Sequence, residues 1–447
     1  MRIAVIGAGI VGVTTAYELT QDGHEVHVFD RCSSIAAESS FANTGVVAPG
    51  YVSPLATPGL PRLLLKQMLQ GSPALRLRPG IDASAWRWLW HTWRACQPAT
   101  YRANRGALVH LTQHSQQRLT DITRHLKLDF EQAQGLLVLL RDDDTLEHAR
   151  RSLPLLQELG IDVREIPTSD AQSHEPGLCP GTALKAVWQL PHSLIGNCRQ
   201  VAHLLKDAAE ARGASFHFGV EVLNVAGGGR PSVTTRPSTQ ADRASALSLS
   251  PSSRTGADDA SNEPREHRFD AVVLCAGADS ARLLAAVGLH LPLQPIYGYA
   301  VSAPVRDPER APVSAVIDER YRVTIARLGN RIRVAGCAEL GGDPDHHRPG
   351  AIATLHRVLN EWFPGAAQPG QHQIWKGARP MLPDGPPLIG PGPQPGLWLN
   401  LGHGASGWAL SCGSAQVLAD LIAQRSPAVD VSRFRIGRWH DTLAAES

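Results

Sequence analysis

The N-terminal segment MRIAVIGAGIVG constrains the fold more than any other part of the chain. Residues 3–6 are apolar and β-branched enough to form a buried parallel strand. Gly7, Gly9 and Gly12 follow in the spacing GxGxxG, at the start of a helical pattern. In such a loop the first glycine permits a tight turn, the second lets a pyrophosphate approach, and the third lets the helix pack closely. The phosphates are then expected at the helix N-terminus, where free N–H groups attract anions.

A second apolar run, 25–29, ends at Asp30, about 18 residues after the glycine loop. A carboxylate at this position can accept hydrogen bonds from both ribose hydroxyls of an adenosine. An ordinary glycine-rich turn between a strand and a helix is the alternative explanation. Because strand, loop, helix, second strand and acid occur together, the sequence predicts a dinucleotide-binding unit.

Length and charge narrow the function classes. A chain of 447 residues has room for two or three packed units. Its formal charge of +2, with no long basic run, argues against nucleic acid as a partner. The seven cysteines form no CxxC pair, so no metal site and no dithiol redox centre is expected. Neither a secretory leader nor a membrane-spanning helix is expected, which predicts a cytoplasmic protein.

Three tryptophans between residues 86 and 94 lie on one face of an expected helix. Trp86, Trp90 and Trp93 follow the spacing i, i+4, i+7, and Arg87 and Arg94 flank them. One interpretation is an aromatic core or a contact between subunits. The other is a surface that meets a hydrophobic electron acceptor or the cytoplasmic face of the inner membrane as a peripheral contact.

Candidate nucleotide-binding segments recur along the chain, separated by segments of another kind. The turn GHGASG, 402–407, joins a strand to a helix as the N-terminal loop does, and a hairpin pattern over 321–337 is typical of an antiparallel sheet. This interleaving predicts an α/β fold in which a Rossmann-like FAD-binding domain alternates with an antiparallel-sheet α+β substrate domain. The expected ranges are 1–55, 195–225, 269–290 and 375–447 for the FAD-binding domain, 56–194 and 291–374 for the substrate domain, and 227–268 for a disordered insertion poor in large apolar residues.

Five motifs together resemble one enzyme family. They are GAGIVG from Gly7, SSFANTG from Ser39, VVLCAGADS from Val272, GARPMLPDGPPLIG from Gly377 and LWLNLGHGASGW from Leu397. The chain is similar to the FAD-dependent D-amino-acid dehydrogenases (small subunit type), within the D-amino-acid oxidase and glycine oxidase superfamily. The resemblance implies that FAD binds non-covalently and that a D-amino acid loses a hydride from its α-carbon to flavin N5. The resulting imino acid is hydrolysed to a 2-oxo acid and ammonia, and the electrons pass to a quinone or another acceptor.

The resemblance also implies roles for residues around the substrate. Arg379 is expected to bind the substrate carboxylate, since a planar guanidinium can form two parallel hydrogen bonds with it. The alternative is a structural ion pair with Asp384. Tyr299 and Tyr321 are candidates for shaping the pocket, because a phenol packs through its ring and hydrogen-bonds through its tip. Core positions are the alternative for both tyrosines.

The turn 402–407 is expected to stabilise the negative charge of the reduced flavin with backbone N–H groups at a helix start. His403 adds a donor to this turn, and a helix cap is the alternative role. The residues expected to bind FAD are Val5, Ile6, Gly7, Ala8, Gly9, Ile10, Val11, Gly12, Asp30, Arg31, Ser39, Ser40, Asn43, Gly45, Val222, Ala276, Gly277, Gly402, Gly404, Gly407 and Trp408.

Three other functions remain open on the sequence. An oxidase of the same superfamily would reduce oxygen directly, with a D-amino acid, glycine or a cyclic imino acid as substrate. An NAD enzyme is disfavoured by the C-terminal glycine-rich turn and helix, which have a place beneath a flavin. A non-catalytic flavin-binding accessory protein is disfavoured by Arg379 within its motif.

Overall fold

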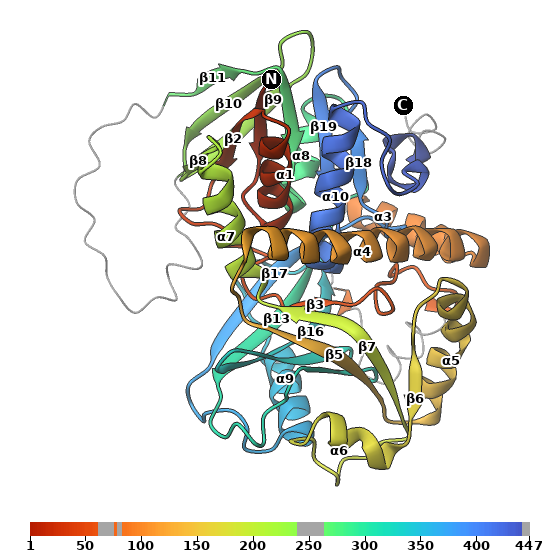
Figure 1. Ribbon diagram of the computed structural model, residues 1–447. Coiled ribbons are helices and arrows are strands. Elements are labelled where there is room, and N and C mark those ends of the chain that lie inside the picture. Colours follow the sequence, from red (N-terminus) through yellow and green to blue (C-terminus); the bar gives the residue numbers. More distant parts are fainter. Residues whose placement is uncertain (61–75, 78–82, 239–262, 440–447) are drawn as a thin grey trace.

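The computed structural model of the chain describes residues 1–60, 76–77, 83–238 and 263–439. Two large sheets occupy the upper and lower halves of Figure 1, and the long helix α4 (Pro98–Leu126) runs between them. The upper sheet has the order β18-β19-β12-β1-β2-β8, in which only β18 is antiparallel to its neighbour. Its strands are β1 (Arg2–Ile6), β2 (Glu25–Asp30), β8 (Ser215–Phe218), β12 (Ala271–Leu274), β18 (Leu388–Pro391) and β19 (Leu397–Leu401).

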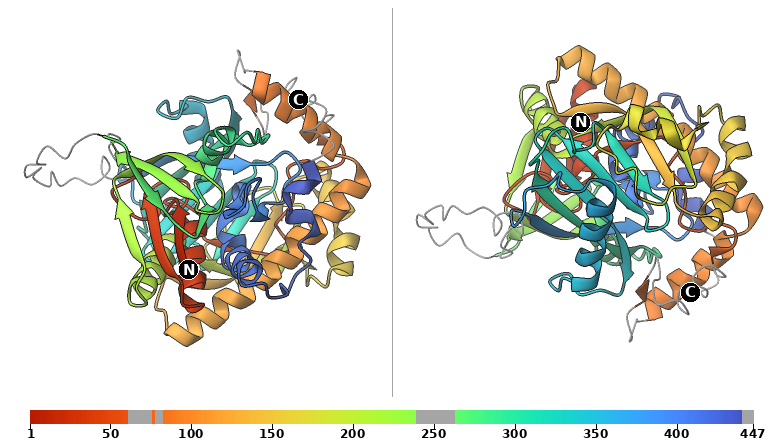
Figure 2. Two further views of the ribbon diagram at one scale, coloured as in Figure 1. Left: turned by 90° about the horizontal axis from the view of Figure 1, so that it is seen from above. Right: turned by 90° about the horizontal axis from the view of Figure 1, so that it is seen from below.

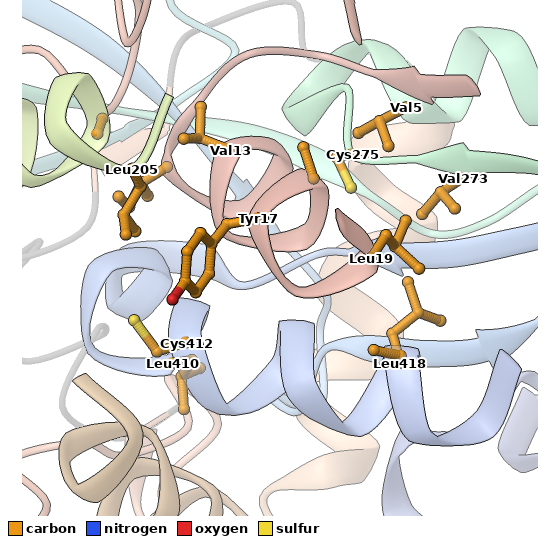
Figure 3. Packing of buried hydrophobic residues seen from close by; sticks show 14 of the residues in the cluster. Val5, Val13, Tyr17, Leu19, Leu205, Val273, Cys275, Leu410, Cys412 and Leu418 are labelled. Carbon is orange, nitrogen blue, oxygen red and sulfur yellow. The ribbon is translucent and has the colours of Figure 1, made fainter. Parts of the chain in front are cut away.

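Alternate residues of β1 point to opposite faces of the upper sheet, and different elements cover the two faces. Ile3 and Val5 belong to the core formed with α4 and three further helices, part of which is drawn in Figure 3. Ala4 and Ile6 belong to a second core formed with a three-stranded antiparallel sheet and one helix. The three further helices of the first core are α1 (Ile10–Gln21), α7 (Cys198–Glu210) and α10 (Gly407–Ile422), and the elements of the second are β9 (Val220–Ala226), β10 (Ser232–Pro237), β11 (Arg265–Arg268) and α8 (Ser280–Ala285).

The lower sheet has the order β17-β13-β16-β15-β14-β5-β7-β3, with β4 added on β16 and β6 on β7. Parallel pairs, such as β14 with β5, interrupt its otherwise antiparallel pairing, so the sheet is mixed where the sequence predicts a purely antiparallel one. Its strands are β3 (Val46–Val47), β4 (Arg76–Leu77), β5 (Gln132–Leu140), β6 (Arg164–Ile166), β7 (Ala186–Gly196), β13 (Gln294–Pro304), β14 (Ala315–Asp318), β15 (Val323–Leu328), β16 (Arg331–Leu340) and β17 (Gln373–Met381).

Helices cover the lower sheet unevenly. α9 (Pro349–Trp362) packs on one face through Leu355 and Trp362. The other face lies towards the upper half of the molecule, and α4 closes the space between the halves by packing Leu111 and Leu119 into the core of the upper sheet. The remaining helices are α3 (Ala83–Ala95), α5 (Asp143–Glu158) and α6 (Ala171–His174). α3, in orange, lies at the periphery in both views of Figure 2.

The division of the chain into sheets differs from the expected domain boundaries at two places. Strands β3 and β17 pair in the lower sheet, although residues 46–55 and 375–381 were expected in the FAD-binding domain. The structure also differs from the expected disorder over 227–268, since β10 and β11 occupy both ends of that range. Val233 is fully buried in the second core. Three consecutive β-branched residues, Val233, Thr234 and Thr235, favour a strand here, and the remainder of the expected insertion, 239–262, lies outside the described residues.

A shortened loop provides a test of this revised boundary. Replacing residues 239–262 by a short Gly-Ser turn is expected to leave the melting temperature and the flavin content unchanged, because β10 and β11 already pair from Thr235 to Arg265. Deleting 230–266 is expected to lower both, since it removes β10, part of β11 and the buried Val233. Thermal unfolding of the two variants beside the parent distinguishes them. Equal stability of the long deletion would contradict a packing role for β10.

Candidate active site

A cavity of about 1360 Å³ lies between the two sheets. Its upper wall contains the carboxyl ends of β1 and β2, the loop 39–46, the segment after β12 and the turn 402–407. In a parallel sheet this edge, outside the carboxyl ends of the strands, is where ligands bind. Its lower wall is the face of the mixed sheet opposite α9. The volume exceeds that of a pocket for a drug-sized ligand, so it can hold a dinucleotide and a substrate together.

The three glycines of the first loop are required for different reasons. A Cβ on Gly7 would lie 2.6 Å from the carbonyl oxygen of Cys275, and one on Gly12 would lie 1.8 Å from the carbonyl oxygen of Gly7. Both glycines are therefore required by packing within the protein. A Cβ on Gly9 meets only Ser40 Oγ, at 3.5 Å, and the backbone there is extended. The fold itself does not require glycine at position 9, and the open space at Gly9 belongs to the cavity.

Side chains hold the glycine loop in shape. Asp30 accepts hydrogen bonds from the N–H of Ala8 at 2.6 Å and of Cys32 at 2.8 Å. Ser40 Oγ accepts from the N–H of Ile10, the first residue of α1. The N–H groups of the next residues in the first turn have no intrahelical acceptor and lie at the cavity end of the helix. Asp30 also lines the cavity, and each of its oxygens keeps a second lone pair for a ribose hydroxyl.

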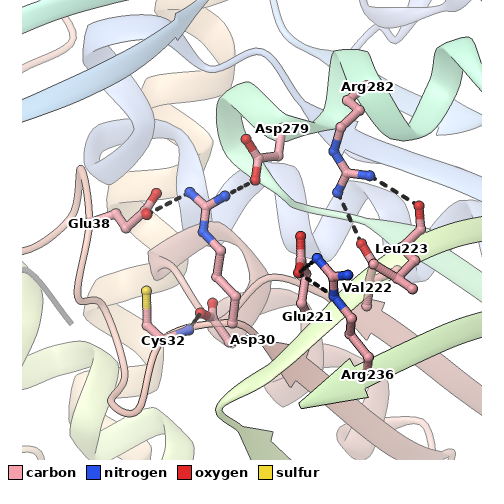
Figure 4. A network of polar contacts seen from close by, with 10 residues as sticks. Asp30, Cys32, Glu38, Glu221, Val222, Leu223, Arg236, Asp279 and Arg282 are labelled. Atoms are coloured by element: carbon pink, nitrogen blue, oxygen red, sulfur yellow. Dashed lines mark hydrogen bonds and ion pairs between the residues drawn. The ribbon is translucent and has the colours of Figure 1, made fainter. Parts of the chain in front are cut away.

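An ion-paired arginine lies at the far end of the dinucleotide region. Arg31 donates to Glu38 at 2.6 Å and to Asp279 (Figure 4). Burial opposes the charge of Arg31, but the two carboxylates outweigh it, and the pKa of the guanidinium is raised. Next to this network, Arg282 donates to the carbonyl of Val222, and both residues line the cavity. These contacts join β2, β9 and the segment after β12 into one wall.

The C-terminal glycine turn forms the wall nearest the lower sheet. Gly402 and Gly404 have φ values of +78° and +58°, which an L side chain rarely adopts. The turn leads directly into α10, whose first N–H groups have no intrahelical acceptor. Trp408 donates from its indole nitrogen to the carbonyl of Gly45 at 3.0 Å, so it fixes the loop 39–46 against the turn.

His403 lies in this turn with a neutral ring, because burial lowers the pKa of its imidazole to about 3. Its Nε2 lies 3.0 Å from Ser414 Oγ, which in turn lies 3.2 Å from the carbonyl oxygen of Ser411. The Ser414 hydroxyl has one proton, which it can donate to the carbonyl of Ser411. In that arrangement His403 donates from Nε2 to the Ser414 oxygen, and its Nδ1 is an acceptor. The ring makes no helix-capping hydrogen bond. Backbone N–H groups are thus better placed than the His403 ring as donors towards a ligand.

Of the residues expected to bind FAD, most line the cavity and four lie behind its wall. The lining residues are Ile6, Gly7, Gly9, Ile10, Val11, Asp30, Arg31, Ser39, Ser40, Asn43, Val222, Ala276, Gly277, Gly402, Gly404, Gly407 and Trp408. Val5, Ala8, Gly12 and Gly45 are not part of the lining. Val5 and Ala8 are core residues, and Gly12 and Gly45 contact backbone behind the loops.

Arg379 reaches across the lower sheet into the cavity. It lies on β17, and its guanidinium crosses the neighbouring strand β13 above Gly298. Its Nη1 donates at 2.7 Å to the carbonyl of Cys337 on the next strand, β16. The guanidinium can cross β13 here because residue 298 is a glycine, since a Cβ at this position would lie 2.2 Å from Arg379 Nη2. A glycine within a strand often marks such a close approach, but the sequence alone did not identify Gly298 as part of the site.

The charge of Arg379 has no carboxylate partner among the described residues, whereas many other arginines are ion-paired. The expected alternative, a pair with Asp384, is wrong, because Asp384 pairs with Arg438 at 2.8 Å. Burial lowers the pKa of Arg379 but leaves it protonated. A buried guanidinium with a single carbonyl acceptor has donors left for an anion in the cavity.

Of the two predicted tyrosines only Tyr299 is part of the cavity lining, and its ring packs away from the cavity. Gly298 faces the cavity, so the strand alternation turns the Tyr299 ring to the opposite face, where it packs in the core with α9. The Tyr299 hydroxyl donates to Glu339 at 2.8 Å, and Lys376 Nζ lies 3.6 Å from the same carboxylate. Tyr321 is not part of the cavity lining. Its ring lies under the guanidinium of Arg141 instead.

Substituting Gly298 tests whether the position of Arg379 matters. Gly298→Ala is expected to displace the guanidinium while the protein folds and retains flavin, because the added methyl meets a flexible side chain. The KM for the substrate should rise by about tenfold or more, since a displacement of roughly 1 Å can cost a hundredfold in rate. Gly350→Ala, whose added methyl meets nothing within 4 Å, is the matched control. An unchanged KM in Gly298→Ala would separate Arg379 from substrate binding.

Comparisons with known proteins agree with this geometry. The model of the DAO family, FAD dependent oxidoreductase, matches residues 2–421. A D-amino acid dehydrogenase of Cereibacter sphaeroides is 39% identical over 98% of this chain and 95% of its own length. A D-amino acid dehydrogenase of Bradyrhizobium diazoefficiens is 36% identical over 98% of this chain and 99% of its own length.

Solved structures share the fold at low sequence identity. Glycine oxidase from Geobacillus kaustophilus superposes with a TM-score of 0.71 at 20% identity, over 98% of each chain. L-proline dehydrogenase from P. horikoshii gives a TM-score of 0.70 at 18% identity, over 99% of this chain and 98% of its own. These similarities cover nearly the whole chain and therefore extend over both sheets. The family match and the full-length relatives establish that the chain belongs to the DAO family of FAD-dependent oxidoreductases.

Proposed function

We propose that this protein oxidises D-amino acids to imino acids, which water converts to 2-oxo acids and ammonia. The observation that carries the proposal is the protonated Arg379, which lines the cavity and has no carboxylate partner among the residues that the structure describes. Full-length relatives named D-amino acid dehydrogenase support the substrate class. Bound FAD supplies the hydride acceptor that this oxidation requires.

The residues of the chain then have separable tasks. Arg379 binds the substrate carboxylate through a planar pair of donors and so fixes the orientation of the α-carbon. The backbone N–H groups of the turn 402–407 and of the first turn of α10 stabilise negative charge that develops at the cofactor. The open cradle at Gly9 and the free N–H groups of α1 hold the pyrophosphate. An amine that binds in its protonated form must lose that proton, so kcat/KM is expected to rise with pH.

An absorbance experiment tests cofactor, reaction and chirality together. The purified protein should show a flavin band that D-amino acids bleach in the absence of oxygen and that L-amino acids leave unchanged. Bleaching by both isomers would contradict the chirality, and no bleaching by either would contradict the reaction. Oxygen consumption during turnover then separates an oxidase from a dehydrogenase.

We also propose that the electrons pass to a quinone at a membrane surface, which α3 contacts. Within the described residues no helix combines the length and apolarity that crossing a membrane requires. α3 instead packs its inner face on the protein through Trp88, which donates to the carbonyl of Met381. Its outer face exposes Trp86, Trp90 and Trp93, 61%, 48% and 57% accessible respectively, and so a core role for these three is wrong. Exposed tryptophans beside arginines suit the interface of an anionic lipid surface.

Removing the exposed tryptophans tests this contact. The triple variant Trp86→Ser, Trp90→Ser and Trp93→Ser is expected to lose binding to anionic vesicles and to reduce a membrane-embedded quinone at least tenfold more slowly. Its rate with a water-soluble dye should remain that of the parent, since Trp88 and the cavity are unchanged. Val313→Ser, at another exposed apolar residue, is the control. A change from dimer to monomer with unaltered vesicle binding would identify α3 as a subunit contact instead.

A further inference from the structure

The cavity extends beyond the region of Arg379 into a second, charged end. The loop 50–60, the first turns of α4, helix α5 and the turn between β14 and β15 line this end. Five arginines belong to its lining. Four of them pair with carboxylates, as Arg102–Glu158, Arg151–Glu147, Arg320–Asp142 and Arg322–Glu319. The fifth, Arg105, forms no ion pair with a described residue.

Arg105 is buried, with only 5% of its surface exposed. Its Nη1 donates to the hydroxyl of Tyr101 at 2.6 Å, and its Nη2 lies 3.4 Å from the carbonyl of Gly50. Its Nε is buried and has no hydrogen-bond partner within the described part of the chain. A buried guanidinium with an unused donor and no counter-ion is unfavourable unless an anion completes it.

Polar side chains beside Arg105 are already arranged as a pocket. Glu319 accepts from the hydroxyl of Tyr51 at 3.1 Å and pairs with Arg322 at 2.9 Å, so its charge is neutralised. Burial and the nearby Arg322 lower the pKa of His148, so its imidazole is neutral at physiological pH. Among the five arginines of this lining, Arg105 is therefore the one without a carboxylate partner in the described part of the chain.

A continuous series of contacts connects this end with the expected carboxylate clamp. Cys337, whose carbonyl holds Arg379, follows Gly336, and a Cβ on Gly336 would lie 2.9 Å from the carbonyl oxygen of Arg322. The guanidinium of Arg379 and the residue before β15, Arg322, thus contact adjacent residues of β16. From Arg322 the contacts continue through Glu319 and Tyr51 to the loop beside Arg105. A substrate held by its α-carboxylate at Arg379 can direct its side chain towards this pocket.

We propose that Arg105, with the hydroxyl of Tyr101, binds a carboxylate at the distal end of the substrate side chain. The structure thereby assigns acidic D-amino acids as a substrate class of this enzyme. The inference rests on the proposed function, because it requires that a D-amino acid occupies the cavity. It adds a second anion site, distinct from Arg379, that selects among side chains.

A substrate series tests the site. The parent should oxidise D-aspartate, D-glutamate or D-2-aminoadipate with a higher kcat/KM than the matching amides. The side-chain length that gives the highest kcat/KM then reports the distance between Arg379 and Arg105. Arg105→Met should lower kcat/KM for the best acidic substrate by about 30-fold or more and leave D-alanine within about twofold. Arg105→Lys should keep more of the parental kcat/KM for this substrate than Arg105→Met does. Tyr101→Phe should lower the same kcat/KM by a smaller factor than Arg105→Met. Arg124→Met, an exposed arginine on the same helix, is the matched control.

Inhibition gives a second readout that does not depend on turnover of acidic substrates. Succinate and glutarate should inhibit D-alanine oxidation more strongly than butyrate and pentanoate, and Arg105→Met should abolish the difference. Equal inhibition by both classes, or equal losses for acidic substrates and D-alanine in a folded, yellow Arg105→Met or Tyr101→Phe, would overturn the proposal. No bleaching of the parent flavin by any D-amino acid would instead overturn the proposed function.

Discussion

Gly9→Val is expected to yield a folded protein without bound flavin and without activity. The φ of −68° at position 9 suits any residue, and an added Cβ meets only Ser40 Oγ at 3.5 Å. The protein alone therefore tolerates a side chain there. The pyrophosphate of FAD does not, because it must approach the backbone at this glycine and the first turn of α1. The absorbance ratio of flavin to protein after purification, with circular dichroism for the fold, measures the result.

Gly12→Ala provides the contrasting control. Its Cβ would lie 1.8 Å from the carbonyl oxygen of Gly7, so this variant is expected to lose thermal stability whether or not FAD is present. If Gly9→Val purified fully yellow, the glycine loop would not hold the pyrophosphate. If it unfolded as Gly12→Ala does, the requirement at position 9 would come from packing.

Arg379→Ala is expected to lower kcat/KM for D-alanine while the flavin is retained. Removing one partner of a buried, hydrogen-bonded charge pair costs about 2–5 kcal/mol, or about 30-fold to several thousand-fold in kcat/KM. Arg379→Lys should give an intermediate value, because it keeps the charge and loses the planar pair of donors. Steady-state kinetics with an artificial acceptor measures the effect, and an amino-acid amide should be a poor substrate for parent and variant alike.

A second arginine, Arg438, contacts the motif that contains Arg379 and serves as a structural control. Arg438 pairs with Asp384 and donates to the carbonyl of Pro387, so Arg438→Ala is expected to lower the melting temperature with little change in KM. The opposite pattern, in which Arg379→Ala loses stability and keeps parental kinetics, would make Arg379 structural and place the clamp elsewhere.

Local sequence signals predicted which segments meet along the upper wall of the cavity. The glycine spacing, Asp30 and the turn 402–407 each lie beside a strand end, and strand ends of one parallel sheet meet at one edge. The prediction was less accurate where the position of a strand depends on its pairing with strands that are distant in sequence. β17 was assigned to the wrong sheet because its nine residues carry no signal for their partner, β13. Strands β10 and β11 were missed because their low apolar content resembles that of a loop.

The expected roles of the tyrosines also depended on strand pairing that the sequence does not reveal. Tyr299 and Gly298 are adjacent in sequence but lie on opposite faces of the sheet, and only the register with β16 and β17 decides which face borders the cavity. The three exposed tryptophans were correctly placed on one helix face, but their exposure depends on Trp88, which occupies the packed face.

By itself the sequence determined the position of the glycine loop and the interleaved order of the two sheets, and it singled out Arg379 as a candidate, because glycine spacing, strand periodicity and motifs act over short stretches. Only the tertiary structure decided which charges lack partners. Arg379 and Arg105 are two of many arginines, and nothing near them in sequence marks them as unpaired. Ion pairing in a folded chain depends on segments far apart, such as Asp384 with Arg438 or Glu18 with Arg118, and burial makes each unpaired charge costly.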